Sequence, residues 1–114
     1  VDLSRALSHA IDGAIWVLKS KGTILKLFKG AQEDFTYTID PPFEAPTQIY
    51  TDLDVDNLYI LDPPTKRIVI LSKEGEVVNQ FTAEELTAPT SMAVDEKNSR
   101  IYVLDSGKIF EIAF

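Results

Sequence analysis

Three similar apolar tetrapeptides recur in this chain at a constant interval. They begin at positions 15, 58 and 101, so each starts 43 residues after the one before. Their sequences are Ile15-Trp16-Val17-Leu18, Leu58-Tyr59-Ile60-Leu61 and Ile101-Tyr102-Val103-Leu104. The tripeptide Ala45-Pro46-Thr47 also returns, as Ala88-Pro89-Thr90. Self-similarity at such a period is typical of repeat proteins, in which each copy is one supersecondary unit.

The second copy divides into four short segments rich in Ile, Val, Leu, Tyr and Phe, the residues that β-strands prefer. These segments are 48–53, 58–61, 67–71 and 77–81. Turn-forming Asp, Asn, Pro and Gly residues separate them. The best helical candidate in this copy, 83–86, is one turn long at most. Four strands in about 43 residues correspond to one blade of a β-propeller.

The other two copies fit the same template. The first gives strands over 6–11, 15–18, 23–28 and 35–39, and the third gives 91–95, 101–104 and 108–113. We therefore predict an all-β fold, a partial β-propeller of two four-stranded antiparallel blades plus three strands of a third. The single segment 1–114 divides into repeats at 3–45, 46–88 and 89–114, the last incomplete. The unbroken apolar tetrapeptides predict strands covered on both faces by neighbouring blades.

Chain length constrains how such a propeller closes. A closed ring needs roughly four to eight blades, whereas 114 residues at 43 per blade supply fewer than three. Because the sequence starts at Val1 rather than Met, the economical interpretation is the C-terminal part of a longer chain. An assembly of several copies and a small open stack of sheets are the alternatives.

Composition and charge exclude several classes of function. A net charge of −7 and a pI near 4.5 argue against binding to a nucleic-acid backbone, which needs a basic face. The hydrophobic and charged fractions are those of a soluble globular protein, and no stretch approaches the length of a membrane span. Without cysteine there are no disulfides or thiolate metal sites, and the cellular compartment stays open.

The order of residues within each repeat resembles the NHL class of propeller blade, which usually forms rings of about six. In the second copy the order is Pro46, Asp54, the tetrapeptide with Asp62, Arg67-Ile68-Val69 and Gly75. The third copy repeats it with Pro89, Asp95, the tetrapeptide with Asp105 and Lys108-Ile109. The first copy departs from it, with Lys19 in place of the strand Asp. The resemblance implies a binding platform, in a few members a metal-dependent lactonase or lyase, and an origin as the C-terminal propeller of a multidomain bacterial protein.

One set of candidate metal ligands recurs with the repeat. His9, Asp52 and Asp95 are spaced by 43 residues, at the end of the first strand of each copy. Since this strand lines the propeller channel, the three side chains could hold a divalent cation, as a lactonase-type site would. In the alternative interpretation, the aspartates cap the following hairpin with their side-chain oxygens.

A second candidate site lies at one end of the blades. Because strand directions alternate, the loops after the second and fourth strands share that end. We predict partner-binding residues there: Phe43, Glu44, Lys66, Arg67, Glu84 and Glu85. Phe43, between prolines and a glutamate, is either an exposed anchor for a partner or a plug packed against the next blade. By contrast, we expect Trp16, Tyr59 and Tyr102 to pack between blades rather than to stack on bases or sugars.

No catalytic constellation is visible in the sequence. It has no cysteine and one histidine, and it contains neither a Gly-x-Ser-x-Gly elbow nor a phosphate-binding glycine loop. We therefore predict a non-catalytic binding or scaffolding segment with a protein or peptide partner and no cofactor. The alternative is a portion of a metal-dependent lactonase or lyase, with a divalent cation. Further blades or further copies are needed to close the ring, and self-assembly as the function itself is a third possibility.

Overall fold

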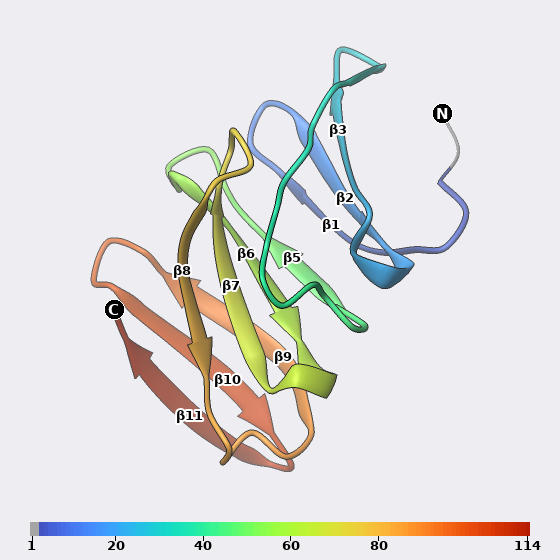
Figure 1. Cartoon of the computed structure of the whole chain (residues 1–114). Coiled ribbons are helices and arrows are strands. Elements are labelled where there is room, and N and C mark those ends of the chain that lie inside the picture. The colour runs from blue at the N-terminus through green and yellow to red at the C-terminus, as the bar shows by residue number, and fades with distance from the viewer. Residues whose placement is uncertain (1–2) are drawn as a thin grey trace.

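Each apolar tetrapeptide lies in the second strand of its own antiparallel sheet in the computed structural model, which describes residues 3–114 (Figure 1). Sheet 1 contains β1 (Ala6–Ile11), β2 (Ile15–Lys19), β3 (Ile24–Phe28) and β4 (Ala31–Glu33). Sheet 2 contains β5 (Gln48–Tyr50), β6 (Asn57–Asp62), β7 (Arg67–Ser72) and β8 (Val77–Thr82). Sheet 3 contains β9 (Pro89–Asp95), β10 (Arg100–Asp105) and β11 (Lys108–Ala113). In each sheet the strands pair in chain order.

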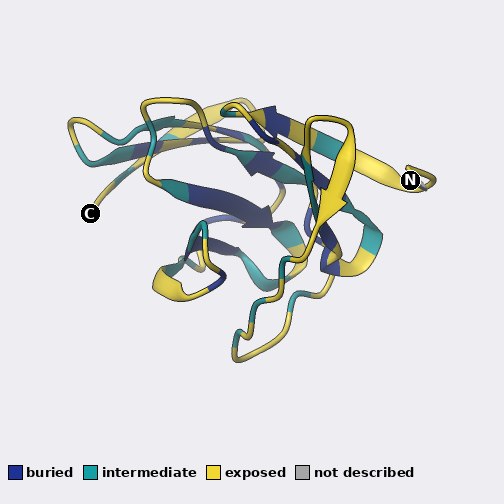
Figure 2. Ribbon diagram, turned by 90° about the horizontal axis from the view of Figure 1, so that it is seen from above, coloured by how far each residue is buried: buried dark blue, intermediate teal, exposed yellow. Residues whose placement is uncertain are grey.

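The three sheets stack face to face around two apolar cores, as predicted. The first core lies between sheets 1 and 2 and includes Trp16, Leu18, Leu58 and Ile60. The second lies between sheets 2 and 3 and includes Tyr59, Leu61, Ile101 and Val103. The tetrapeptide of sheet 2 thus serves both cores, because alternate side chains of a strand point to opposite faces. Figure 2 shows the buried residues gathered in the inner strands, whereas exposed residues lie on the loops and on outer strands such as β4.

Of the three tetrapeptides, only that of sheet 2 is covered on both faces. All four of its residues are fully buried. In the end sheets, one face of the tetrapeptide meets sheet 2 and no sheet packs on the other, although Val17 on that face of sheet 1 is only 5% exposed. Ile15 of sheet 1 is 40% exposed, and Tyr102 and Leu104 of sheet 3 are 37% and 42% exposed. The prediction was therefore wrong for one face of each end sheet, because no sheet of the described residues packs on those faces.

The fourth strand of sheet 1 differs from the prediction of 35–39. Lys29 and Gly30 form a two-residue turn with φ of 51° and 79°, which closes the hairpin early and places the strand at Ala31–Glu33. Residues 34–47, the interstrand link, then leave sheet 1 and run along sheet 2 (Figure 1). Phe35, Tyr37 and Ile39 alternate into the first core, which explains why this stretch has the sequence of a strand.

The remaining strand predictions agree with the structure to within two residues, except that β5 ends at Tyr50 rather than at position 53. The short 83–86 segment forms a turn, in which the Leu86 N–H donates to the Ala83 carbonyl. Two single-turn 3₁₀ helices, η1 (Ser20–Gly22) and η2 (Pro63–Thr65), connect the second and third strands of sheets 1 and 2. Among residues 3–114 there is no helix with the length and apolar character needed to span a bilayer.

Polar side chains fasten the first strand of one sheet to the first strand of the next. Gln48 accepts a hydrogen bond from the Met92 N–H at 2.8 Å and donates one to the Met92 carbonyl at 3.1 Å. In the same way, Ser8 accepts from the Ile49 N–H at 3.1 Å and donates to the Ile49 carbonyl at 3.4 Å. Each clasp, as we call this pair of bonds, satisfies backbone groups that the sheet's own ladder leaves free.

We expect Gln48→Ala to lower the free energy of unfolding by about 1–3 kcal/mol. The substitution leaves the buried N–H and carbonyl of Met92 without hydrogen-bond partners. Urea denaturation followed by circular dichroism measures the change. The matched control is Gln32→Ala on exposed β4, which should change stability by no more than about 0.5 kcal/mol. Equal effects of the two substitutions would show that the clasp contributes no stability.

Candidate functional site

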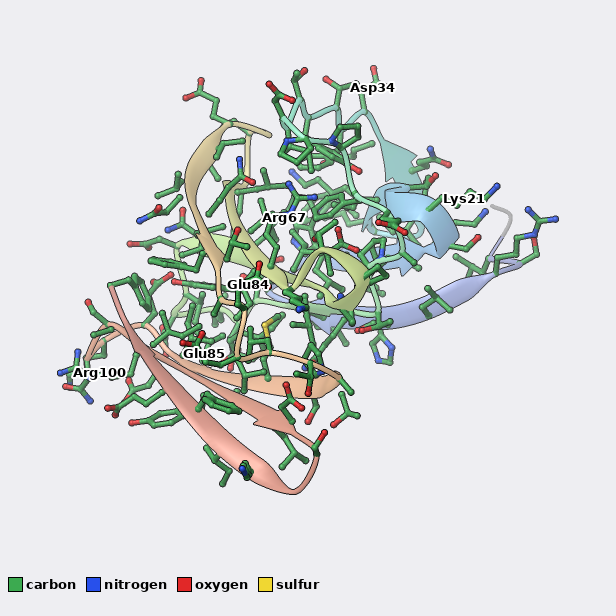
Figure 3. All side chains as sticks on the ribbon, turned by 60° about the horizontal axis from the view of Figure 1, so that its bottom comes forward. Lys21, Asp34, Arg67, Glu84, Glu85 and Arg100 are labelled. Carbon is green, nitrogen blue, oxygen red and sulfur yellow. The ribbon has the colours of Figure 1, made fainter. Side chains whose placement is uncertain are left out.

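The predicted partner-binding end of sheet 2 is organised around a buried arginine. Arg67, the first residue of β7, is 2% exposed. Its Nη1 donates to the Pro41 carbonyl at 2.6 Å and its Nη2 to the Pro42 carbonyl at 3.0 Å. In Figure 3, Arg67 lies near the middle of the view, surrounded by other side chains. The prediction that Arg67 is a partner-binding residue is therefore wrong: its charge is used inside the protein.

Asp62 is the counter-charge of Arg67. It ends β6, it is fully buried, and its Oδ2 lies 3.1 Å from Nη2 of Arg67. The carboxylate also accepts hydrogen bonds from the N–H groups of Glu44 and Ala45, at 3.1 Å and 2.9 Å, and from the Thr65 hydroxyl. Burial raises the pKa of Asp62, but these donors and Arg67 outweigh it and hold the pKa below its ordinary value. The Asp62–Arg67 pair thus fixes the end of the interstrand link to sheet 2.

Phe43 lies half-buried beside this pair. Its ring centroid is 5.7 Å from that of Tyr37 and 5.4 Å from the guanidinium carbon of Arg67. It packs against the first core, and Tyr37 in turn donates a hydrogen bond to the carbonyl of Gly22 in η1, which connects β2 and β3. Of the two interpretations of Phe43, this packing favours the plug, because its ring fills space between sheets 1 and 2.

The other predicted residues at this end remain accessible. Glu44, Glu84 and Glu85 are exposed, and Lys66 is half-buried. Lys66 Nζ lies 3.2 Å from Glu84 Oε2, and the Lys66 carbonyl accepts a hydrogen bond from the Ala83 N–H. These contacts, with those of Asp62, gather loops from three parts of the chain at one end of sheet 2. We call the exposed carboxylates Glu44, Glu84 and Glu85 with Lys66 the acidic rim.

The candidate metal ligands do not share one position. Strand register pairs His9 with Val17, whereas Asp95 pairs with Arg100 and Asp52 lies beyond the end of β5. His9 therefore corresponds to Ile49 and Met92, which pair with Ile60 and Val103. The expectation that His9 is equivalent to Asp52 and Asp95 is wrong, because the hairpin after β1 is shorter than the hairpins after β5 and β9.

The hairpin positions are occupied by Asp12, Asp52 and Asp95. Asp52 accepts a hydrogen bond from the Leu53 N–H at 2.7 Å, and Asp95 accepts from the Asn98 N–H and side-chain amide. These bonds agree with the hairpin-capping interpretation of the two aspartates. Within residues 3–114, no group of three or more His, Cys, Asp or Glu side chains lies close enough together to hold a metal ion.

Two carboxylates missed by the sequence analysis tie the aromatic strand residues in place. Asp12 accepts a hydrogen bond from Trp16 Nε1 at 2.9 Å and pairs with Lys73 Nζ of sheet 2 at 2.6 Å. Burial raises the pKa of Asp12, but the bonds from Lys73 and Trp16 outweigh it and leave the pKa lowered. Glu96 of sheet 3 accepts from the Tyr59 hydroxyl at 2.7 Å, and burial together with this bond raises the Tyr59 pKa.

These bonds confirm that Trp16 and Tyr59 pack between sheets, with their polar atoms satisfied at the edge. Tyr102 occupies the same position on sheet 3 but stands on its open face. At intervals of 43 residues Glu96 corresponds to Leu53 and Ala10, so the repeat gives no sequence signal that could have pointed to it.

Comparison with known proteins extends these observations. No model of a known protein family matches the sequence, and no curated protein is significantly similar to it. Among solved structures, streptogramin B lyase superimposes with a TM-score of 0.63 at 17% identity, over 95% of this chain and 40% of that one. Nidogen in its complex with laminin gives a TM-score of 0.65 at 16% identity, over 88% and 39%. Both are β-propellers. The chain is a partial β-propeller.

A third propeller of the same kind, virginiamycin B lyase from Staphylococcus aureus, matches with a TM-score of 0.58 at 20% identity, over 94% of this chain and 40% of its own. The partial propeller thus spans about 40% of the length of these proteins. At such identities the likeness shows the fold alone. It agrees with the predicted propeller blades, whereas their assignment to the NHL class stays a prediction.

Proposed function

We propose that this partial propeller is a non-catalytic binding and scaffolding segment, and that its acidic rim contacts a basic protein or peptide. The observation that carries the proposal is the way the rim is held. Glu44 follows directly on a backbone fixed by Asp62 and Arg67, and Glu84 is paired with Lys66. Charged side chains on loops fastened in this way are preorganised, so binding orders little additional chain.

The charge balance of the rim favours a cationic partner. Arg67 is neutralised internally by Asp62, and Lys66 is engaged by Glu84. Glu44 and Glu85 are exposed and stand in no ion pair among the described residues. Rim charges of one sign steer and orient an oppositely charged partner more than they add affinity. A Lys- or Arg-bearing segment is therefore the chemistry that this surface supports best.

The known propellers support more than one role for the fold. Nidogen, which superimposes on this chain, is in a complex with the protein laminin. Two other structures that superimpose on it are lyases. The fold therefore supports the proposal only in showing that such a scaffold can bind protein, and for this chain the acidic rim carries the proposal.

We expect a labelled peptide of alternating lysine and glycine to bind this chain and to bind the Glu44→Gln/Glu84→Gln/Glu85→Gln variant roughly tenfold more weakly. Three exposed charge contacts of about 0.5 kcal/mol each give about 1.5 kcal/mol, and about 1.4 kcal/mol corresponds to a tenfold change. Fluorescence anisotropy at low ionic strength measures the affinity, because salt screens such contacts.

The matched control neutralises three exposed carboxylates at the other end of sheet 2: Asp54→Asn/Glu74→Gln/Glu76→Gln. It changes the net charge by the same amount and should change the affinity less than about twofold. Equal losses in both variants would mean that the peptide responds to net charge alone, and the rim would not be a binding site.

The lyase neighbours favour a second candidate, a part of a metal-dependent lactonase or lyase. In that case Ca²⁺ or Zn²⁺ should raise the melting temperature, since a ligand that binds only the folded state stabilises it. Asp52→Asn and Asp95→Asn should then abolish the shift. An unchanged melting temperature with either metal would argue against this candidate for the present segment.

A further inference from the structure

Two apolar sheet faces of this molecule are left uncovered by the described residues. The front face belongs to sheet 3 and carries Ser91, Ala93, Tyr102, Leu104 and Ile109, around a hollow of about 210 Å³. The back face belongs to sheet 1 and carries Leu7, His9, Ile15 and Leu27 around a hollow of about 300 Å³, which the buried Val17 also lines. Contiguous exposed apolar surface of this kind marks an interaction site more often than a free surface.

The internal sheet–sheet contacts show what each face is shaped to meet. In each sheet we call the face toward the next sheet along the chain the front and the opposite face the back. Between sheets 1 and 2, Trp16 and Leu18 on the front of sheet 1 pack against Leu58 and Ile60 on the back of sheet 2. Between sheets 2 and 3, Tyr59 and Leu61 pack in the same way against Ile101 and Val103. The contact is thus used twice within one chain, always with a front face against a back face.

The two open faces are the unused halves of this contact. Tyr102 and Leu104 follow Tyr59 and Leu61 by 43 residues, so the front face of sheet 3 repeats the front face of sheet 2. Ile15 and Val17 precede Leu58 and Ile60 by the same interval, so the back face of sheet 1 repeats the back face of sheet 2. One chain therefore presents both partners of its own internal interface, at opposite ends.

The position of the clasp residue also repeats from sheet to sheet. Ser8, Gln48 and Ser91 pair with Leu18, Leu61 and Leu104, which are equivalent positions. Ser8 and Gln48 each hold the backbone of the next sheet's first strand. Ser91 has no such partner among the described residues, although its place in the register is the same.

The backbone that Ser91 would hold also has an equivalent. Ile49 and Met92, the clasped residues, correspond by register to His9 on the back face of sheet 1. No described side chain clasps His9. A polar fastening is thus available on both open faces, in addition to their apolar side chains.

We propose that the occupant of each open face is a second copy of this chain, bound head to tail, front face against back face. The interaction involves a surface other than the acidic rim and is independent of the function proposed for that rim. Ser91 of one copy clasps the backbone at His9 of the other. Leu104 and Tyr102 then pack on Ile15 and Val17, as Leu61 and Tyr59 pack on Ile101 and Val103.

Two copies make a closed assembly. A front-to-back contact is heterologous, so it forms a ring when the rotation closes. Two copies joined by two such contacts contain six stacked sheets, which is within the roughly four to eight that propellers use. Closure leaves neither apolar face open, and it favours a discrete dimer over an extending chain.

Sedimentation and multi-angle light scattering between about 1 and about 500 μM test the proposal, a range that reports dissociation constants in the micromolar region. The wild-type chain should be a dimer at the upper end of this range. Leu104→Glu and Ile15→Glu should each be monomeric, with the dimer weakened roughly 100-fold or more, because a carboxylate buried without a partner is strongly disfavoured. Both residues are about equally exposed in one chain, at 42% and 40%, so the variants should still fold.

Mixing the two monomeric variants separates this geometry from the alternatives. Leu104→Glu keeps its back face and Ile15→Glu keeps its front face, so an equimolar mixture should form a heterodimer through one intact contact. A front-to-front dimer would instead survive Ile15→Glu, and a back-to-back dimer would survive Leu104→Glu. The control Leu53→Glu, on an exposed turn of sheet 2, should leave the dimer unchanged.

The outcomes that overturn the proposal are distinct. A wild-type chain that stays monomeric across the range would show that a second copy does not cover these faces. Polydisperse aggregation that persists in Leu104→Glu and Ile15→Glu would show association that is not specific to them. A mixture of variants that stays monomeric would exclude the head-to-tail contact.

Discussion

Replacing Arg67 by methionine is expected to lower the free energy of unfolding by about 3–5 kcal/mol. The substitution leaves the fully buried Asp62 carboxylate without its counter-charge, and the loss of one member of a buried pair has an effect of this size. The carbonyls of Pro41 and Pro42 lose their donors at the same time. Urea denaturation followed by circular dichroism measures the change, and proteolysis should cut first in the interstrand link that Arg67 holds.

The matched control is the same substitution at an exposed arginine. Arg100 faces Glu111 at 3.7 Å with both side chains about half exposed, so Arg100→Met should lower stability by less than about 1 kcal/mol. Similar losses at the two positions would contradict a structural role for the Asp62–Arg67 pair. They would also reopen the possibility that Arg67 acts at the surface.

Replacing Gly75 by alanine is expected to lower the free energy of unfolding by about 3 kcal/mol or more. A Cβ at this position would lie 1.9 Å from the Thr36 carbonyl oxygen, so the interstrand link or the β7–β8 turn must move. The backbone at Gly75 also has φ of +94°, which is strained for any L side chain. Overpacking and backbone strain act together here. Urea denaturation measures the loss.

Gly13→Ala separates these two causes. Gly13 has φ of +100°, but a Cβ there would meet no atom within 4 Å. It should therefore show the backbone strain alone, about 1–2 kcal/mol. If Gly75→Ala were no more destabilising than Gly13→Ala, the link would not press against the β7–β8 turn as the structure describes.

Much of the fold follows from local pattern. The 43-residue period identified three stacked sheets, and the apolar tetrapeptides located their second strands. Because strand and turn preferences act over a few residues, the bounds of most strands could also be predicted. The same reasoning found the segments of the acidic rim, since alternating strand direction brings their loops to one end.

Two errors came from the lengths of turns. Because Lys29-Gly30 is a two-residue turn, β4 begins at Ala31, earlier in the chain than predicted. Residues 35–39 therefore lie outside the sheet and pack on the first core. The hairpin after β1 is shorter than those after β5 and β9, so His9 is not in the register of Asp52 and Asp95. A constant repeat period does not show how the residues of one repeat are divided between its turns. A shorter turn at one place can be offset by a longer one elsewhere in the same repeat.

The sequence by itself determined the architecture of this protein, which is a series of repeated all-β units that stack through their apolar second strands. Only the tertiary structure decided which charged side chains are paired in the interior. Arg67 and Lys66 are neighbours in sequence, yet Arg67 is buried and Lys66 is half-buried. It also decided which apolar faces remain open. Strand and turn preferences are local properties of the chain, whereas burial, ion pairing and free sheet faces depend on which distant segments come to lie against each residue.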